Sequence, residues 1–264
     1  AMGVITLLTD FGLKDGNVGV MKGVILGIAP QVQIVDLSHL VPPQDILEAG
    51  LILSRSAPFF PEGTIHVVVV DPGVGTDRRP MAAQVGAQFY VGPDNGTLTM
   101  WLEQAQARGE AARFYHLDRP QAWLPRVSHV FHGRDIFAPV AAQLANGVAL
   151  ADLGSAMHDP VRLHLPRPIA TSTGWVGEVI HLDHFGNIST NIRQEHLSSM
   201  DVRVRLGGQV VDGMVRTFGD GKPGDLIALF GSTGNLIVAE VNGSAAGRLQ
   251  VRVGAAVTVE YRSP

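Results

Sequence analysis

The stretch Thr64-Ile65-His66-Val67-Val68-Val69-Val70, followed directly by Asp71-Pro72-Gly73, decides the fold of this chain. Its valines are continuous rather than alternating with polar residues, which is typical of a parallel strand covered on both faces. Asp71, Pro72 and Gly73 are turn formers, so the strand ends abruptly at Val70. We therefore expect a buried strand in an α/β sheet, with Asp71 at its carboxyl end.

Short apolar segments and helical patterns alternate on both sides of this strand. Residues 4–8, 34–37 and 88–92 are predicted strands, and residues 16–28, 45–55 and 136–145 have the apolar spacing of helices. A further helix follows the loop at 93–96 and runs through Glu103. Alternation of this kind predicts an α/β domain with a mostly parallel sheet and helices on its faces.

The pattern changes after Pro166-Arg167-Pro168. Glycine turns separate short predicted strands at 177–182, 188–192, 202–206, 226–230, 236–241 and 249–261, and a helix is expected only at 193–199. This pattern predicts a small all-β, barrel-like domain. The expected domains are therefore residues 1–168 for the α/β part and residues 175–264 for the β part.

Composition excludes several classes of function. The 264 residues carry a net charge of −4 without a block of like charge, so nucleic acid is not an expected partner. The lack of cysteine excludes thiol catalysis, disulfides and thiolate metal sites, and it fits a reducing cytoplasm. The first residues lack the regions of a signal peptide, and no apolar run approaches the ~20 residues of a membrane span. We expect a soluble cytoplasmic protein.

Three polar clusters follow predicted strands of the first domain, at the strand ends where open α/β sheets bind ligands. They are Thr9-Asp10-Phe11-Gly12, Asp71-Pro72-Gly73-Val74-Gly75 and Pro93-Asp94-Asn95-Gly96. Each cluster alone is equally well explained as a turn. Three of them in one sheet favour a shared site.

Local chemistry singles out Asp71 and His132. A carboxylate at the rim of an apolar strand is partly desolvated, which favours proton acceptance, and Arg78 or Arg79 on the same loop can compensate its charge. The alternative is an ordinary loop salt bridge. His132 precedes the helix predicted at 136–145, where the helix dipole disfavours the imidazolium and leaves a neutral ring that can orient a water. The alternative is a capping or surface histidine, since the chain has 10.

In the second domain, Asn187 and Phe218 are candidates for binding an aromatic base. Asn187 ends the polar turn that begins at Asp183 and offers both a donor and an acceptor, and Phe218 offers a stacking face. A hairpin turn and a core phenylalanine are the simpler explanations. The sequence contains neither a phosphate-binding loop nor a dinucleotide fingerprint.

Taken together, these segments resemble the S-adenosylmethionine (SAM) hydroxide adenosyltransferases, a family of adenosine-forming SAM hydrolases related to SAM-dependent fluorinases and chlorinases. The matching motifs run in order through nearly the whole chain. They are Leu8-Thr9-Asp10-Phe11-Gly12, Phe59-Phe60-Pro61-Glu62-Gly63-Thr64, Val70-Asp71-Pro72-Gly73-Val74-Gly75-Thr76, Pro93-Asp94-Asn95-Gly96, Phe131-His132-Gly133-Arg134-Asp135 and Asp183-His184-Phe185-Gly186-Asn187.

The resemblance implies an α/β domain, a C-terminal β-barrel and a homotrimer with active sites at subunit interfaces. It implies a hydrolytic triad of Asp71, Arg78 and His132, with Arg79 as the adjacent alternative to Arg78. It also implies a set of substrate contacts. These are Asp10 for the ribose hydroxyls, Asn187 and Phe218 for adenine, Asp183 for the methionine amino group and, by a looser match, Ser232, Glu240 and Asn242.

Departures from the halogenating relatives decide the expected nucleophile. Those enzymes replace the Asp with an apolar or phenolic residue, and the fluorinases have Tyr-Ser in place of His132-Gly133. Asp71 would repel a halide, whereas water needs an acceptor for its proton. We therefore expect slow hydrolysis of SAM to adenosine and methionine that speeds up as pH rises, without a metal or cofactor. Thr233 stands where the fluorinases carry an arginine, so the contact to the methionine carboxylate is not defined.

Three other functions remain open at this stage. A chlorinase-like halogenase would release a chloride-dependent product, 5′-chloro-5′-deoxyadenosine. A metallohydrolase built on Asp10, Asp71 and His132 would be inhibited by a chelator. A non-catalytic adenosine or SAM-binding protein would bind adenosine tightly without turnover.

Overall fold

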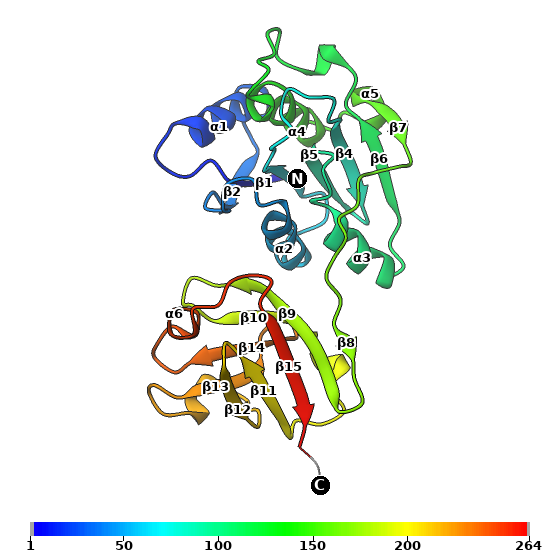
Figure 1. Cartoon of the computed structure of the whole chain (residues 1–264). Coiled ribbons are helices and arrows are strands. Elements are labelled where there is room, and N and C mark those ends of the chain that lie inside the picture. The colour runs from blue at the N-terminus through cyan, green and yellow to red at the C-terminus, as the bar shows by residue number, and fades with distance from the viewer. Residues whose placement is uncertain (1–2, 263–264) are drawn as a thin grey trace. The chain divides into compact units, whose positions relative to one another are not determined.

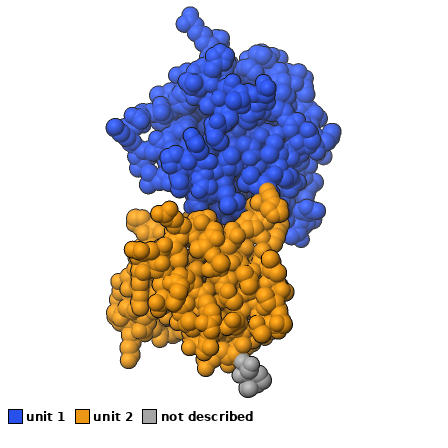
Figure 2. Space-filling model, in the orientation of Figure 1, with its two compact units in different colours: residues 1–163 blue, residues 164–264 orange. Residues whose placement is uncertain are grey.

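The computed structural model describes residues 3–262, which divide into two compact units (Figure 2). Unit 1 ends at Leu163 and unit 2 begins at His164, earlier than the junction expected at 166–174. Backbone hydrogen bonds explain this boundary. The Val161 N–H donates to Asp94 at 2.8 Å and the Leu163 N–H donates to Thr99 at 2.9 Å, so the chain stays attached to unit 1 up to this point.

Unit 1 contains a seven-stranded sheet in the order β2-β1-β3-β5-β4-β6-β7 within the described residues (Figure 1). β2, β1, β3 and β5 pair in parallel, whereas β4, β6 and β7 add antiparallel pairs. The strand bounds are β1 Val4–Thr9, β2 Gln33–Ser38, β3 Ile65–Val69, β4 Pro80–Val85, β5 Gln88–Pro93, β6 Ala112–His116 and β7 Ser155–Met157.

Helices cover both faces of this sheet. They are α1 Asn17–Ile28, α2 Ile46–Ser56, α3 Thr99–Ala107, α4 Ala138–Ala145 and the short α5 Leu150–Leu153. Single turns occur at Ala57–Phe59 and Pro120–Ala122, and a π-helical turn, Gly133–Phe137, precedes α4.

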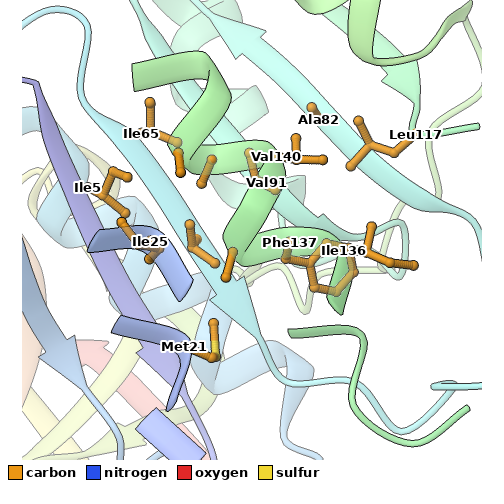
Figure 3. Close-up of a cluster of buried hydrophobic side chains, with 14 of the residues drawn as sticks. Ile5, Met21, Ile25, Ile65, Ala82, Val91, Leu117, Ile136, Phe137 and Val140 are labelled. Carbon is orange, nitrogen blue, oxygen red and sulfur yellow. The ribbon is translucent and has the colours of Figure 1, made fainter. Parts of the chain in front are cut away.

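The valines around β3 show why the strand is central. Val67 and Val69 pack into the core that contains the buried side chains of α1 and α4. Figure 3 shows this core with Met21 and Ile25 of α1 and Val140 of α4. Val68 and Val70 pack into the opposite core, with residues of α2 and α3. All four are 3% exposed or less. The strand covered on both faces is therefore confirmed.

Unit 2 is an all-antiparallel sheet in the order β12-β11-β15-β9-β10-β14-β13, with β8 paired to β9. Its strands curl around a main apolar core, as those of a small barrel do (Figure 1), and a smaller apolar cluster lies on β13 and β14. The bounds are β8 Ile169–Ala170, β9 Gly174–Leu182, β10 Ile188–Arg193, β11 Val202–Leu206, β12 Gln209–Asp212, β13 Leu226–Phe230, β14 Asn235–Glu240, β15 Ala256–Tyr261 and the short helix α6 Ala245–Leu249. The predicted fold class, an α/β domain followed by a barrel-like β domain, is confirmed.

Two local predictions in unit 2 are wrong. The helix expected at 193–199 is a single 3-10 turn, Gln194–His196. The strand expected at 249–261 begins only at Ala256, because Leu249 ends α6 and Gln250 reverses the chain with φ +50. A second 3-10 turn, Phe218–Asp220, lies between β12 and β13.

Candidate active site

Two of the three polar clusters meet at one edge of the unit 1 sheet. β1 and β3 run in parallel with Thr9 paired to Val69, so Asp10 and Asp71 follow the two strands at the same edge. A pocket of about 250 Å³ lies at this edge. It is lined by Asp10, Phe11, Gln44, Val69, Asp71, Pro72, Val74, Val130, Phe131, His132 and Gly133. The third cluster, at 93–96, is not part of this lining.

Asp71, Arg78 and His132 form one cluster at the pocket. The Arg78 Nε donates to Asp71 Oδ1 at 2.9 Å and Nη2 donates to Asp71 Oδ2, so the ion pair is bidentate. The same Nη2 lies 3.0 Å from Nδ1 of His132. Only 5% of the Asp71 side chain and 7% of the Arg78 side chain are exposed. Asp71 and Arg78 come from one loop, and His132, 54 residues after Arg78, joins them at this buried ion pair.

The two adjacent arginines have separate partners. Arg78 binds Asp71, and its guanidinium lies 5.6 Å from the ring centroid of Phe137. Arg79 donates to Asp94 instead, through Nε at 3.0 Å and Nη2 at 2.7 Å. The guanidinium beside Asp71 is thus that of Arg78.

A glycine allows the loop that follows β3 to pack against the segment that carries His132. Gly75 has φ +77, and a Cβ at this position would lie 2.3 Å from the backbone oxygen of His129. Any larger residue would be strained in this conformation and would clash with backbone. The close approach of these two segments therefore depends on glycine at position 75.

A buried carboxylate fixes the turn that follows His132. Asp135 accepts hydrogen bonds from the backbone of Ser128 at 2.7 Å and from Nε of Arg134 at 2.6 Å. Its side chain is fully buried. π-helical turns such as the one that contains Asp135 often occur at functional sites.

The electrostatics of the cluster determine the protonation of His132. Burial and the positive charge of Arg78 lower the pKa of His132 below its ordinary value of 6.5. A neutral His132 was predicted from the helix dipole, whereas desolvation and the charge of Arg78 are what lower its pKa in the structure. A guanidinium carries only donors, so Nδ1 of His132 must accept and the ring proton lies on Nε2.

Asp10 is held at the pocket by an unusual backbone conformation. Its Oδ2 accepts a hydrogen bond from the backbone N–H of Gln44 at 2.8 Å. Gln44 has φ +68, which is rare for a residue other than glycine and often marks a functional position. Sequence reasoning missed Gln44 and Val130 as pocket residues. Neither lies in a recognisable motif.

Unit 2 contains a pocket of its own, of about 740 Å³. Four predicted residues, Asn187, Phe218, Glu240 and Asn242, line it together with Phe185, Gly219, Gly221, Pro223, Val241 and Gly243. Asp183 is not part of the lining, and its carboxylate accepts hydrogen bonds from the backbone and the Nδ2 of Asn187, both at 2.8 Å. Ser232 is an exposed residue of the β13–β14 turn outside the lining.

Neither a metal cluster nor a membrane helix is found within residues 3–262. No three His, Cys, Asp or Glu side chains of this range are placed to hold a metal ion. Asp10, Asp71 and His132, the ligands of the metallohydrolase alternative, are therefore not preassembled as a metal site. No helix of the same range is both long and apolar enough to cross a membrane.

The chain is a two-domain protein: the α/β unit has a pocket beside a buried carboxylate–guanidinium pair, and the barrel-like β unit has a pocket of its own. The chain belongs to the SAM hydroxide adenosyltransferase family. The N-terminal domain of that family matches residues 5–154, and its C-terminal domain matches residues 177–258. The resemblance inferred from the motifs is confirmed.

Named relatives fall into two groups. The chain is 41% identical to the (R)-S-adenosyl-L-methionine hydrolase of Salinispora arenicola over 253 residues, which covers 95% of each chain. It is 30% identical to the fluorinase of an Actinoplanes species, in a match that covers 97% of each chain. A crystal structure of an uncharacterized conserved protein from Thermotoga maritima matches with a TM-score of 0.90 and 36% identity, covering 98% of this chain and all of that one.

Proposed function

We propose that this protein hydrolyses SAM, releasing adenosine and methionine. The observation that carries this proposal is the buried Asp71–Arg78 pair with His132 beside it, at the wall of the unit 1 pocket. Family membership and the hydrolase relatives support the substrate. Those relatives are named for the (R) form of SAM, and we extend this preference to the present chain.

In the proposed reaction, a water attacks C5′ of SAM in line with the sulfonium, which leaves as the neutral thioether of methionine. Asp71 accepts the proton of this water, and Arg78 fixes the carboxylate through two hydrogen bonds. The products are adenosine, which keeps the oxygen of the water, and methionine. SAM is the substrate, and no metal or redox cofactor takes part in these steps.

His132 acts in this scheme as a hydrogen-bond donor. Because Nδ1 accepts from Arg78, the remaining proton lies on Nε2. A neutral Nε2–H can donate to the attacking water and orient it, but it cannot remove its proton. The acceptor role therefore falls to Asp71 and the orienting role to His132.

The remaining predicted contacts define how the substrate binds. We assign the ribose hydroxyls to Asp10 and the adenine to the unit 2 pocket with Asn187 and Phe218. Glu240 and Asn242 line the same pocket. Asp183 and Ser232 stay predictions from the family resemblance. The carboxylate of Asp183 is engaged by Asn187, so it would need to rearrange to meet an amino group.

The proposal includes a homotrimer in which unit 1 of one subunit and unit 2 of its neighbour share each active site. Light scattering after gel filtration measures the oligomer. Mixing Asp71→Asn and Asn187→Ala subunits tests the shared site, because a mixed oligomer then contains sites with both residues intact. Recovered activity supports the arrangement and no recovery contradicts it. The cytoplasmic location stays a prediction from the sequence.

Product analysis tests the proposal directly. Purified protein incubated with SAM should release adenosine and methionine in equal amounts. A chloride-dependent 5′-chloro-5′-deoxyadenosine would instead identify a halogenase. Tight adenosine binding without product over a long incubation would identify a binding protein. Either of these two results would overturn the proposal.

A further inference from the structure

The third polar cluster, Pro93-Asp94-Asn95-Gly96, lies outside the unit 1 pocket although it follows a parallel strand of the same sheet. Its two central residues nevertheless contact both ends of the loop at 71–79, which carries Asp71 and Arg78. We name Asp94 and Asn95 the 94–95 clamp. Their contacts indicate what this cluster does.

Asn95 holds the beginning of the 71–79 loop. Its Nδ2 donates to the backbone oxygen of Val70 at 2.8 Å, and Val70 directly precedes Asp71. The amide cannot turn around, because its Oδ1 accepts from the hydroxyl of Thr97 at 2.6 Å and from the Thr97 backbone at 3.3 Å. The orientation of the Val70–Asp71 peptide is therefore fixed by Asn95.

Asp94 holds the end of the same loop. Its Oδ2 accepts two hydrogen bonds from the guanidinium of Arg79, and its backbone N–H donates to the Arg79 oxygen at 2.9 Å. The Asp94 side chain is 1% exposed, whereas the Arg79 side chain is 30% exposed. Arg79 follows Arg78 directly, so the hydrogen bonds between Asp94 and Arg79 also restrict the position of the Arg78 backbone.

The 71–79 loop combines hydrogen bonds of its own, such as that from the Thr76 N–H to the Gly73 oxygen at 3.1 Å, with the contacts that the 94–95 clamp makes at its two ends. It contains Gly73 and Gly75, which leave the backbone free to adopt many conformations. The bidentate Asp71–Arg78 pair requires both ends of the loop to keep a fixed separation. Neither residue of the 94–95 clamp lines the pocket, so neither is placed to touch a substrate there.

We propose that Asp94 and Asn95 are positioning residues that set the geometry of the Asp71–Arg78 pair. This inference rests on the proposed function, because it assigns the clamp to the same reaction. The clamp acts on the chemical step through the loop, and it leaves the binding of SAM unchanged. Displacement of a catalytic group by about 1 Å lowers a rate about 100-fold, so the loss of one clamp contact has a measurable effect on kcat.

The kinetic test compares Asn95→Ala with Asn146→Ala. Asn146 makes the same kind of bond at the end of α4, from Nδ2 to the oxygen of Ile28 at 2.9 Å, and it is a matched control outside the site. Asn95→Ala should lower kcat about 10-fold or more with KM within about twofold, whereas the control should change neither. Equal losses in both variants, or no loss in Asn95→Ala, would overturn the proposal.

Arg79→Lys provides a second variant that keeps a positive charge beside Asp94 and therefore avoids a buried unpaired carboxylate. Lysine has one ammonium in place of the Nε and Nη2 donors that both reach Oδ2 of Asp94, so kcat should fall several-fold at constant KM. Unchanged kcat in this variant would contradict the role of Asp94, even if Asn95→Ala failed to fold.

A readout without substrate separates this inference from the proposed function. In wild-type protein labelled with ¹⁵N-arginine, the Arg78 Nε–H bonded to Asp71 should give a protected NMR signal. Asn95→Ala should shift or broaden this signal, and Asn146→Ala should leave it unchanged. An unaltered signal in Asn95→Ala would overturn the clamp. If wild-type protein released no adenosine, the proposed function would fail. The Arg78 signal would then still test whether the 94–95 clamp positions the Asp71–Arg78 pair.

Discussion

Replacement of Asp71 by asparagine perturbs both stability and chemistry by amounts that the structure allows us to work out. The asparagine oxygen can still accept from Arg78 Nε, but its amide group would face the Nη2 donor. The guanidinium, with 7% of its side chain exposed, would lose its counter-ion. Removing one partner of a buried ion pair costs about 3–5 kcal/mol, and because one hydrogen bond is retained the expected loss is about 3 kcal/mol.

The same substitution removes the proposed proton acceptor. We expect kcat to fall about 10²- to 10⁴-fold, while SAM binding measured by calorimetry changes little. Asp212→Asn is a matched control, because Asp212 pairs with Arg203 at 2.7 Å and both side chains are well exposed. This control should change the free energy of unfolding far less than Asp71→Asn does, and it should keep full activity.

Two assays decide the outcome for Asp71→Asn. Adenosine release measures the chemical step, and urea unfolding followed by circular dichroism measures the free energy of unfolding. A variant that keeps kcat within about threefold of wild type would refute the acceptor role of Asp71. A stability loss no larger than that of Asp212→Asn would refute the argument from burial.

Three further predictions concern histidines. His132→Gln can present an N–H near the position of Nε2, whereas His132→Asn replaces only the Nδ1 acceptor. The kcat of His132→Asn should fall about 100-fold, and His132→Gln should retain a higher kcat. Equal rates of the two variants would contradict the donor role of His132. The value of kcat/KM should decrease as pH falls through the pKa of His132, which lies below 6.5, because the imidazolium would place a donor against Arg78; a midpoint above 7 in the profile would be inconsistent with this. Burial lowers the pKa of His66 to about 4, whereas His66 of the unfolded chain has a pKa near 6.5. The unfolded chain therefore binds this proton first, and the free energy of unfolding should fall by about 3 kcal/mol between pH 6.5 and 4. His66→Gln should show a correspondingly smaller pH dependence in urea titrations.

The parallel half of unit 1 was predictable because β1, β3 and β5 contain short apolar runs with turn formers close after them, and β2 has the shorter run of residues 34–37. The antiparallel half was not predicted. β4 contains Pro80, Ala82 and Ala83, which are weak strand formers, and it becomes a strand through its pairing with β5 and β6. β5 follows β4 after only two residues, whereas β6 lies farther along the chain, and neither pairing leaves a local periodicity in the sequence of β4.

The candidate site was predictable where single residues carry distinctive chemistry. Asp71 and His132 stand beside turn formers and a helix start, and the structure places both at Arg78. The positive φ of Gln44 and the contacts of the 94–95 clamp depend on tertiary structure, so no sequence pattern indicates them. The sequence also did not reveal why His132 is neutral, because its burial and the neighbouring charge of Arg78 arise only on folding.

Attack of water at C5′ of SAM is the central claim, and isotope incorporation tests it most directly. The protein is incubated with SAM in ¹⁸O-enriched water, and the adenosine is analysed by mass spectrometry with fragmentation of the ribose. The account predicts one ¹⁸O atom in the 5′-hydroxyl of adenosine and none in methionine. Unlabelled adenosine, or label in the methionine product, would contradict it.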